Sequence, residues 1–231
     1  MQKNKLHFLV INGSPKRRNT YTVLSWVAEG AEEAGGTTEY IDIADLNIGY
    51  CQGCHTCLRT GECPVKDDMA ALLQKIEVSD GIIVGSPVYD GYPSAQMKTV
   101  IDRTALLKLY TGILEDKYTI GVATSGIAPT KKTAKKVAMT FGRPLGWIGV
   151  KTATISGGYQ KISKESFHKK YKKARELGKE LVTETKKGSK KWSLKFAWIN
   201  FLRKHMLKKL VVNNKDQFGG VVKVFKEKSW L

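Results

Sequence analysis

Leu6-His-Phe-Leu-Val-Ile-Asn-Gly-Ser-Pro-Lys-Arg-Arg-Asn-Thr20 is the stretch that decides the fold. Its apolar beginning predicts a buried strand over Leu6–Asn12, and Gly13 and Pro15 then mark a turn. A helix-length segment with apolar residues at helical spacing follows, from Thr20 to Ala34. A strand, a tight loop and a helix in this order predict the start of a β-α-β unit and therefore a parallel sheet.

The same alternation continues along the chain. Further strands are expected at Thr38–Ile43, Asp80–Gly85, Lys117–Ala123 and Trp147–Ile155, and further helices at Asp67–Glu77, Ser94–Tyr110, Lys131–Phe141 and Lys164–Lys187. Near-continuous apolar runs such as Gly81–Gly85 are typical of strands covered on both faces. The sequence therefore predicts an α/β fold with a doubly wound five-stranded parallel sheet over residues 1–187, whose ligand lies at the carboxyl ends of the strands.

The loop after the first strand has the composition of an anion-binding loop. Gly13 permits a tight turn, Ser14 and Thr20 supply hydroxyl groups, and Asn19 or Thr20 can cap the following helix. The free amides of a first helical turn favour a terminal phosphate. The loop matches neither a Walker A sequence nor a dinucleotide fingerprint, and an ordinary capped turn would have a similar sequence.

Two later loops are expected at the same edge of the sheet. They follow the third and fourth strands and offer backbone amides, small residues and an aromatic ring. These features suit a flat slot for a heteroaromatic ring such as an isoalloxazine. The first of these loops covers Gly85–Lys98 and the second covers Thr124–Pro129.

All four cysteines lie in one loop, Cys51-x2-Cys54-x2-Cys57-x5-Cys63, which follows the second strand. This count and spacing suit the four thiolate ligands of a 4Fe–4S iron-sulfur cluster. Zinc is less favoured because structural zinc sites usually join two separated CxxC pairs, and metal-free redox thiols are a third alternative. We expect Asp67, Asp68, Asp102 and Arg103 to form helix-start charges and an ion pair or subunit contact, and we assign no catalytic side chain.

Taken together, these motifs resemble one known family. The motifs are Asn12-Gly-Ser-Pro15 with Asn19-Thr20, the cysteine run with Gly53 and Gly61, Asp67-Asp-Met69, Ser86-Pro-Val-Tyr89 and Lys98-x2-Ile-Asp-Arg103. In this order, over roughly residues 6–160, the chain resembles the NADPH-dependent FMN reductase superfamily, and within it the iron-sulfur flavoproteins. The resemblance implies a flavodoxin-like fold and a flavin-dependent oxidoreductase.

The resemblance also implies where FMN binds and what exchanges electrons with it. It places phosphate contacts at Ser14, Asn19 and Thr20, to which we add Lys16 of the same loop. It places ring contacts at Pro87, Val88, Tyr89, Thr124, Ser125 and Gly126, to which we add Gly91. In one interpretation ferredoxin reduces the cluster, which passes electrons to FMN. In the other, NAD(P)H reduces FMN directly, and the flavin reduces a small-molecule acceptor such as a quinone. Relatives form dimers or tetramers, so a homodimer or homotetramer is expected.

The C-terminal part of the chain is strongly basic. Residues 1–130 hold 12 Lys/Arg and 15 Asp/Glu, whereas residues 131–231 hold 27 and 6. We predict a basic amphipathic helical extension over residues 188–231, with an apolar row at Trp192, Phe196, Ile199, Leu202, Met206 and Leu210. Packing onto the domain or onto a subunit partner is favoured for this row over contact with a membrane surface or with nucleic acid.

The remaining features bound the protein's location and class. Leu6–Ile11 follows the N-terminus without the pattern of a signal peptide, and no apolar run approaches membrane-spanning length, so a cytoplasmic location is expected. A competing hypothesis of another class is a basic protein that binds nucleic acid or an acidic partner on the same scaffold. The absence of recognised nucleic-acid-binding signatures argues against specific nucleic-acid recognition.

Overall fold

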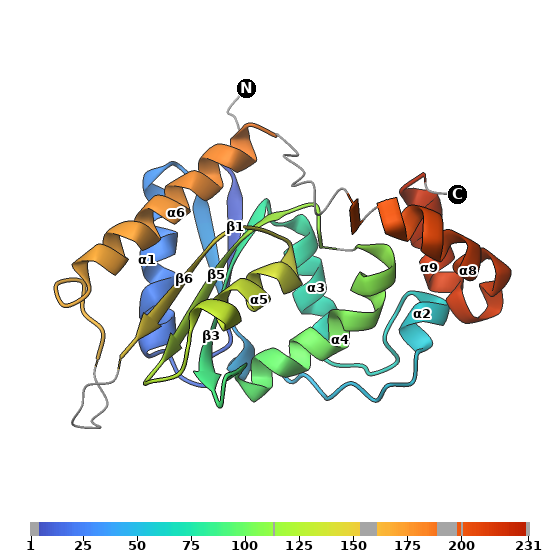
Figure 1. Ribbon diagram of the computed structural model, residues 1–231, viewed down its shortest axis with the longest axis horizontal. Helices are drawn as coiled ribbons and strands as arrows, with labels where there is room; N and C mark the ends of the chain where they lie inside the picture. The colour runs from blue at the N-terminus through green and yellow to red at the C-terminus, as the bar shows by residue number, and fades with distance from the viewer. Residues whose placement is uncertain (1–4, 113, 153–160, 189–197, 200, 230–231) are drawn as a thin grey trace.

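Five strands of the protein run parallel in one sheet (Figure 1). The computed structural model describes residues 5–112, 114–152, 161–188, 198–199 and 201–229. The strands are β1 (His7–Asn12), β2 (Thr37–Asp42), β3 (Gly81–Tyr89), β5 (Tyr118–Ser125) and β6 (Arg143–Lys151), arranged in the order β2-β1-β3-β5-β6. This is the flavodoxin-type order of a doubly wound sheet, as predicted.

Helices cover both faces of the sheet, which explains the apolar strands. Figure 1 shows α1 (Asn19–Glu33) and α6 (His168–Lys186) on one face and α3 (Met69–Val78), α4 (Ala95–Thr111) and α5 (Lys131–Phe141) on the other. Alternate residues of β1 belong to different cores: Phe8 and Val10 pack with α1 and α6, and Leu9 and Ile11 with the three other helices. All four side chains are fully buried.

Two strands extend further than the sequence predicts. β3 continues past Gly85 to Tyr89 and pairs antiparallel with the short β4 (Tyr92–Pro93), and β5 continues through Ser125. The predicted stop at Gly85 was wrong, since the strand continues through Pro87. β1 ends opposite Gly85, so Pro87 has a strand neighbour on one side only, a position that tolerates proline.

The last predicted strand was also displaced. The structure begins β6 at Arg143 and ends it at Lys151, whereas the sequence suggested Trp147–Ile155. Pro144 lies at the irregular start of the β5–β6 pairing, where the register shifts between Thr119 and Ile120. Residues 153–155 lie outside the described part of the chain.

The described part of the C-terminal extension is helical, but it is not one regular α-helix. A π-helical turn, η2 (Arg203–Leu207), leads into α8 (Lys208–Asn213), and a further helix, α9 (Lys215–Glu227), follows. The sequence analysis did not expect α9 as an element. Trp192 and Phe196 of the predicted row lie outside the described residues.

α9 packs against the cysteine loop, more than 150 residues earlier in the chain. The loop contains a short helix, α2 (Thr56–Thr60), whose Leu58 is buried in a cluster with Val211, Val221 and Phe225. A Cβ added at Gly220 would lie 2.0 Å from the backbone nitrogen of Gly61, so glycine is required for this approach. The extension therefore covers α2 (Figure 1).

A second close approach, between α1 and α6, gives a test of the fold. A Cβ at Gly178 would lie 2.0 Å from the carbonyl oxygen of Val27, and one at Gly30 would lie 2.0 Å from that of Arg175. We expect Gly178→Ala to lower the free energy of unfolding by about 1–3 kcal/mol, because the two helices must separate. Urea denaturation measures this loss.

The matched control for this substitution is Lys172→Ala, at an exposed position of the same helix. Its effect should stay within about 0.5 kcal/mol. Equal stability of Gly178→Ala and the wild type would contradict the close α1–α6 packing.

Candidate functional site

The loops at the carboxyl ends of β1, β3 and β5 are joined by hydrogen bonds. The amide of Gly13 donates to the carbonyl of Gly85 over 2.8 Å, and the hydroxyls of Thr20 and Thr124 lie 2.7 Å apart. The hydroxyl of Ser94, which caps α4, donates to the carbonyl of Gly13. Three segments that are far apart in the sequence therefore meet at one edge of the sheet, as expected.

A buried carboxylate fixes the β1–α1 loop. Asp42 accepts hydrogen bonds from Asn12 Nδ2 and Arg17 Nε, both over 2.6 Å, and Asn12 Oδ1 accepts one from the amide of Ser14 over 3.1 Å. Asn12 and Asp42 are paired in register at the ends of β1 and β2. The sequence analysis missed this pair, although two polar residues ending adjacent parallel strands were a usable signal.

The predicted phosphate-binding residues differ in their environment. Ser14, Asn19 and Thr20 are buried, whereas Lys16 is exposed. The expected capping by Asn19 or Thr20 was wrong. Arg18 occupies the cap position of α1 without a capping side chain, and Asn19 Oδ1 instead accepts a hydrogen bond from the amide of Ile162 over 3.1 Å.

The predicted ring-binding residues lie on strand ends and a tight hairpin. Pro87 and Val88 belong to β3 and are buried, and Thr124 and Ser125 end β5. Asp90 and Gly91 both have positive φ, 47° and 81°, as in the two-residue type I′ turns favoured by Asp-Gly.

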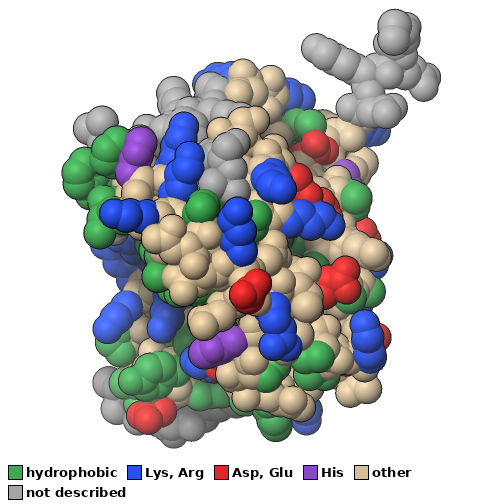
Figure 2. Space-filling view, turned by 90° about the vertical axis from the view of Figure 1, so that its right-hand side faces the viewer, with side chains coloured by type: hydrophobic (Ala, Val, Ile, Leu, Met, Phe, Trp, Pro, Cys, Tyr) green, Lys and Arg blue, Asp and Glu red, His purple; other side chains and the backbone are tan. Residues whose placement is uncertain are grey.

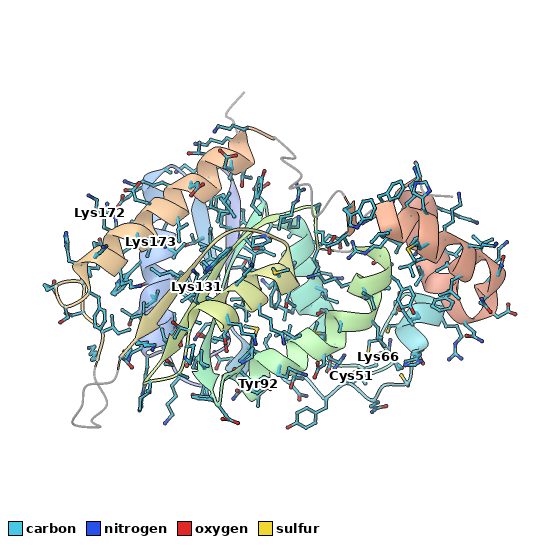
Figure 3. The ribbon with its side chains drawn as sticks, viewed as in Figure 1. Cys51, Lys66, Tyr92, Lys131, Lys172 and Lys173 are labelled. Carbon is cyan, nitrogen blue, oxygen red and sulfur yellow. The ribbon has the colours of Figure 1, made fainter. Side chains whose placement is uncertain are left out.

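This hairpin places Tyr89 opposite Tyr92 in the β3–β4 pairing. Both rings are more than half exposed. Tyr92, which was not among the predicted contacts, lies toward the lower edge of Figure 3. Gly126 is also exposed, at the end of β5.

The four cysteine thiols share one loop but do not form a finished ligand set. Cys51 and Cys54 are exposed, and Cys57 and Cys63 are partly buried. Among the described residues, no three His, Cys, Asp or Glu side chains are grouped to hold a metal ion. Burial and, next, the thiols of Cys63, Cys51 and Cys54 raise the pKa of Cys57.

A buried ion pair anchors this loop to α4. Arg103 Nη1 and Nη2 donate to Asp67 Oδ2 and Oδ1 over 2.6 and 3.1 Å, and the two side chains are only 1% and 5% exposed. Arg103 also donates to the carbonyl of Gly49, and Asp67 accepts hydrogen bonds from the amides of Gly49 and Met69. One cation thus holds both ends of the cysteine loop.

The expected ion pair exists, with the partner defined by the fold. Arg103 pairs with Asp67 rather than with its neighbour Asp102, which pairs with Lys98 at the surface. Asp67, together with the Cys63 thiol, raises the pKa of Arg103. The Nε atom of Arg103 is buried and lacks a hydrogen-bond partner among the described groups.

The fold and this site define a class of flavodoxin-like α/β proteins with a four-cysteine loop anchored to α4. The sequence matches the NADPH-dependent FMN reductase family over residues 6–160, and the chain belongs to that family. The family predicted from the motifs is thereby confirmed. Its fold and family are those of flavin-dependent oxidoreductases.

The relatives include several iron-sulfur flavoproteins. One from Archaeoglobus fulgidus is 36% identical over 53% of this chain and 60% of its own length, and one from Methanocaldococcus jannaschii is 43% identical over 43% and 52%. The chain thus spans between half and two thirds of these relatives' length. A second Archaeoglobus fulgidus protein is 34% identical over 74% of this chain and 77% of its own length.

Solved structures share the fold at low sequence identity. The structure of RosB with a bound riboflavin-5′-phosphate derivative has a TM-score of 0.60 and 15% identity, and it covers 79% of this chain and 81% of RosB. A flavone reductase has a TM-score of 0.58 and 20% identity, and the match covers 78% of this chain and 63% of the flavone reductase chain. These likenesses support the α/β fold.

The Arg103–Asp67 pair predicts a large stability effect. Arg103→Leu should lower the free energy of unfolding by about 3–5 kcal/mol, because it leaves a buried carboxylate without its cation. The double variant Arg103→Leu with Asp67→Leu should recover part of this loss. The control Lys98→Ala, which breaks a half-exposed pair, should cost less than about 1 kcal/mol in the same urea titration.

The same pair predicts an acid-labile contribution to stability. Hydrogen bonds from Arg103 lower the pKa of Asp67 below its ordinary value of 3.8. The stabilisation is therefore complete above pH 3.8 and is lost as the pH falls through the lowered pKa. An Asp67→Asn variant with the same acid dependence as the wild type would contradict this assignment.

Proposed function

We propose that the chain is an FMN-dependent oxidoreductase whose flavin binds at the carboxyl edge of the sheet. The observation that carries this proposal is the meeting of the β1–α1 loop with the ends of β3 and β5, joined by the Gly13–Gly85 and Thr20–Thr124 hydrogen bonds. Membership of the FMN reductase family supports the same choice of cofactor. RosB, a protein of the same fold, has a riboflavin-5′-phosphate derivative bound in its solved structure.

The residues around this edge suit FMN in chemistry. Ser14, Lys16, Asn19 and Thr20 would hold the phosphate at the N-terminus of α1, where amides and the helix dipole favour an anion. Bound FMN supplies hydride and electron transfer, for which the protein supplies orientation and electrostatics. Pro87, Val88, Tyr89 and Gly91 on one side, and Thr124, Ser125 and Gly126 on the other, would contact the ring.

We further propose that Cys51, Cys54, Cys57 and Cys63 hold a 4Fe–4S cluster. The donor set fits in number and chemistry, since one loop supplies four thiols and the Cys63 thiol interacts with the buried guanidinium of Arg103. The unpartnered Nε–H of Arg103 is a donor of the kind that stabilises negative charge on cluster sulfur. A bound cluster would supply one-electron transfer close to the flavin site.

A second candidate is a reductase that uses the flavin without a cluster. The open arrangement of the thiols, two of them exposed, favours this alternative. NAD(P)H would then be the electron donor, whereas ferredoxin is the donor in the cluster-bearing form. The acceptor as a small molecule, assembly into a homodimer or homotetramer, and a cytoplasmic location stay predictions.

Flavin titration tests the main proposal. The wild type should bind FMN more tightly than riboflavin, because the loop contacts the phosphate, and should quench flavin fluorescence. Ser14→Ala should weaken FMN binding about tenfold, which equals about 1.4 kcal/mol, and leave riboflavin binding unchanged. The control is Ser25→Ala on α1, whose hydroxyl bonds to the carbonyl of Thr22. A protein that FMN cannot reconstitute would exclude the proposal.

Metal analysis of anaerobically purified protein tests the cluster. We expect iron and acid-labile sulfide in equal amounts and a broad thiolate-to-iron absorption beside the flavin bands. Cys57→Ser should remove the iron and the broad absorption while FMN binding remains. Flavin bands without iron would favour the second candidate. Stoichiometric zinc would show that the four cysteines hold a structural metal and not a cluster.

A further inference from the structure

The C-terminal extension presents large apolar side chains to solvent. Trp198, Phe201, Met206 and Leu210 are 60%, 51%, 67% and 45% exposed. We call these four residues the apolar row, which shares only Met206 and Leu210 with the row predicted from the sequence. Successive members are three, five and four residues apart, and η2 is π-helical between Phe201 and Leu210, so residues five apart come close to one another there.

The apolar row is not the surface that holds the extension on the domain. Other residues of the same segment make the contacts with the domain. Arg203 Nη1 pairs with Glu115 Oε2 over 2.6 Å, Arg203 Nε donates to the carbonyl of Leu109 over 2.8 Å, and Val211 is fully buried against α2 and α9. The segment is therefore held on the domain through Arg203 and Val211. Met206 and Leu210, which were expected to pack onto the domain or onto a subunit partner, are exposed instead.

The aromatic part of the row is ordered by ring contacts. The rings of Trp198 and Phe201 are stacked with centroids 5.6 Å apart, and the Phe201 ring lies 4.3 Å from that of His205. These contacts leave more than half of each aromatic side chain exposed. The apolar surface is thus formed before any partner binds.

Exposed lysines are interleaved with the row in the same segment. Lys204, Lys208 and Lys209 are exposed and line a shallow hollow of about 300 Å³ together with Val212. The sequence from Thr185 to Lys215 holds ten Lys/Arg residues and no Asp or Glu. Figure 2 shows hydrophobic and Lys/Arg side chains next to one another on the end of the molecule that the extension forms.

We propose that this surface binds a bilayer that contains anionic lipids. Long lysines beside Trp, Phe, Met and Leu are the composition of interfacial segments, in which the apolar groups enter the headgroup boundary and the cations contact lipid phosphates. A second copy of the chain suits this surface less well, because a twofold contact would place the same lysines against one another. None of the described helices is long and apolar enough to cross a membrane, so the contact is peripheral.

Co-sedimentation of the full chain with vesicles tests the proposal. We expect binding to phosphatidylcholine vesicles that contain phosphatidylglycerol, with about tenfold weaker binding to phosphatidylcholine alone and a steep loss at high salt. The tryptophan emission of the protein should shift to the blue on binding, and this shift should be smaller in Trp198→Phe. This test does not depend on flavin or metal content.

Two pairs of variants separate a specific surface from general stickiness. The triple variant Phe201→Ser, Met206→Ser and Leu210→Ser should lose binding, whereas the control Val78→Ser with Ile127→Ser changes two highly exposed apolar residues elsewhere and should retain it. Lys204→Gln, Lys208→Gln and Lys209→Gln together should also lose binding. Their control is Lys131→Gln, Lys172→Gln and Lys173→Gln, far from the extension in Figure 3.

Circular dichroism and the melting temperature show whether each variant keeps its fold. If a triple variant unfolds, the single substitutions Leu210→Ser and Lys208→Gln replace it. Wild-type protein that ignores anionic vesicles would overturn the proposal. Equal losses in the test and control variants would do so too, as would sedimentation equilibrium in which the apolar row proves to join two copies of the chain.

Discussion

Parallel pairing with a fixed register is the constraint on which the rest of the structure depends. Because β1 pairs in the same direction with β2 and β3, and β3 with β5, the carboxyl ends of all four strands lie at one edge of the sheet. Asn12 then lies beside both Asp42 and Gly85. The hydrogen bonds that shape the first loop follow from this neighbourhood, and a one-residue slip of register would separate their partners.

Helix α4 joins the two halves of the candidate site. Its capping residue Ser94 contacts the carbonyl of Gly13 in the β1–α1 loop, and Arg103, nine residues later, holds the cysteine loop through Asp67. At 1.5 Å per helical residue the two anchors are about 13 Å apart along the helix axis. A single rigid element therefore sets the distance between the loop assigned to the flavin phosphate and the loop assigned to the metal.

The sequence predicted what depends on local periodicity and on strand order. It gave the five parallel strands, the covering helices and the loops that meet at one edge, because apolar runs such as Phe8–Ile11 report burial on both faces. It did not predict contacts between residues far apart in the chain, such as Asp67 with Arg103 or Asn19 with Ile162. Capping and pairing of this kind depend on the tertiary fold, and nothing in the local sequence distinguishes Asp67 from Asp102 as the partner of Arg103.

The contact between α9 and α2 has a consequence for biosynthesis. The chain is synthesised from its N-terminus, so the cysteine loop leaves the ribosome long before α9 does. Until α9 is made, Gly61 and Leu58 lack their contacts with Gly220 and Phe225. During this interval Cys57, which packs against the same cluster in the finished fold, lacks that cover. Closing of the extension over α2 is then a late event in the folding of the chain.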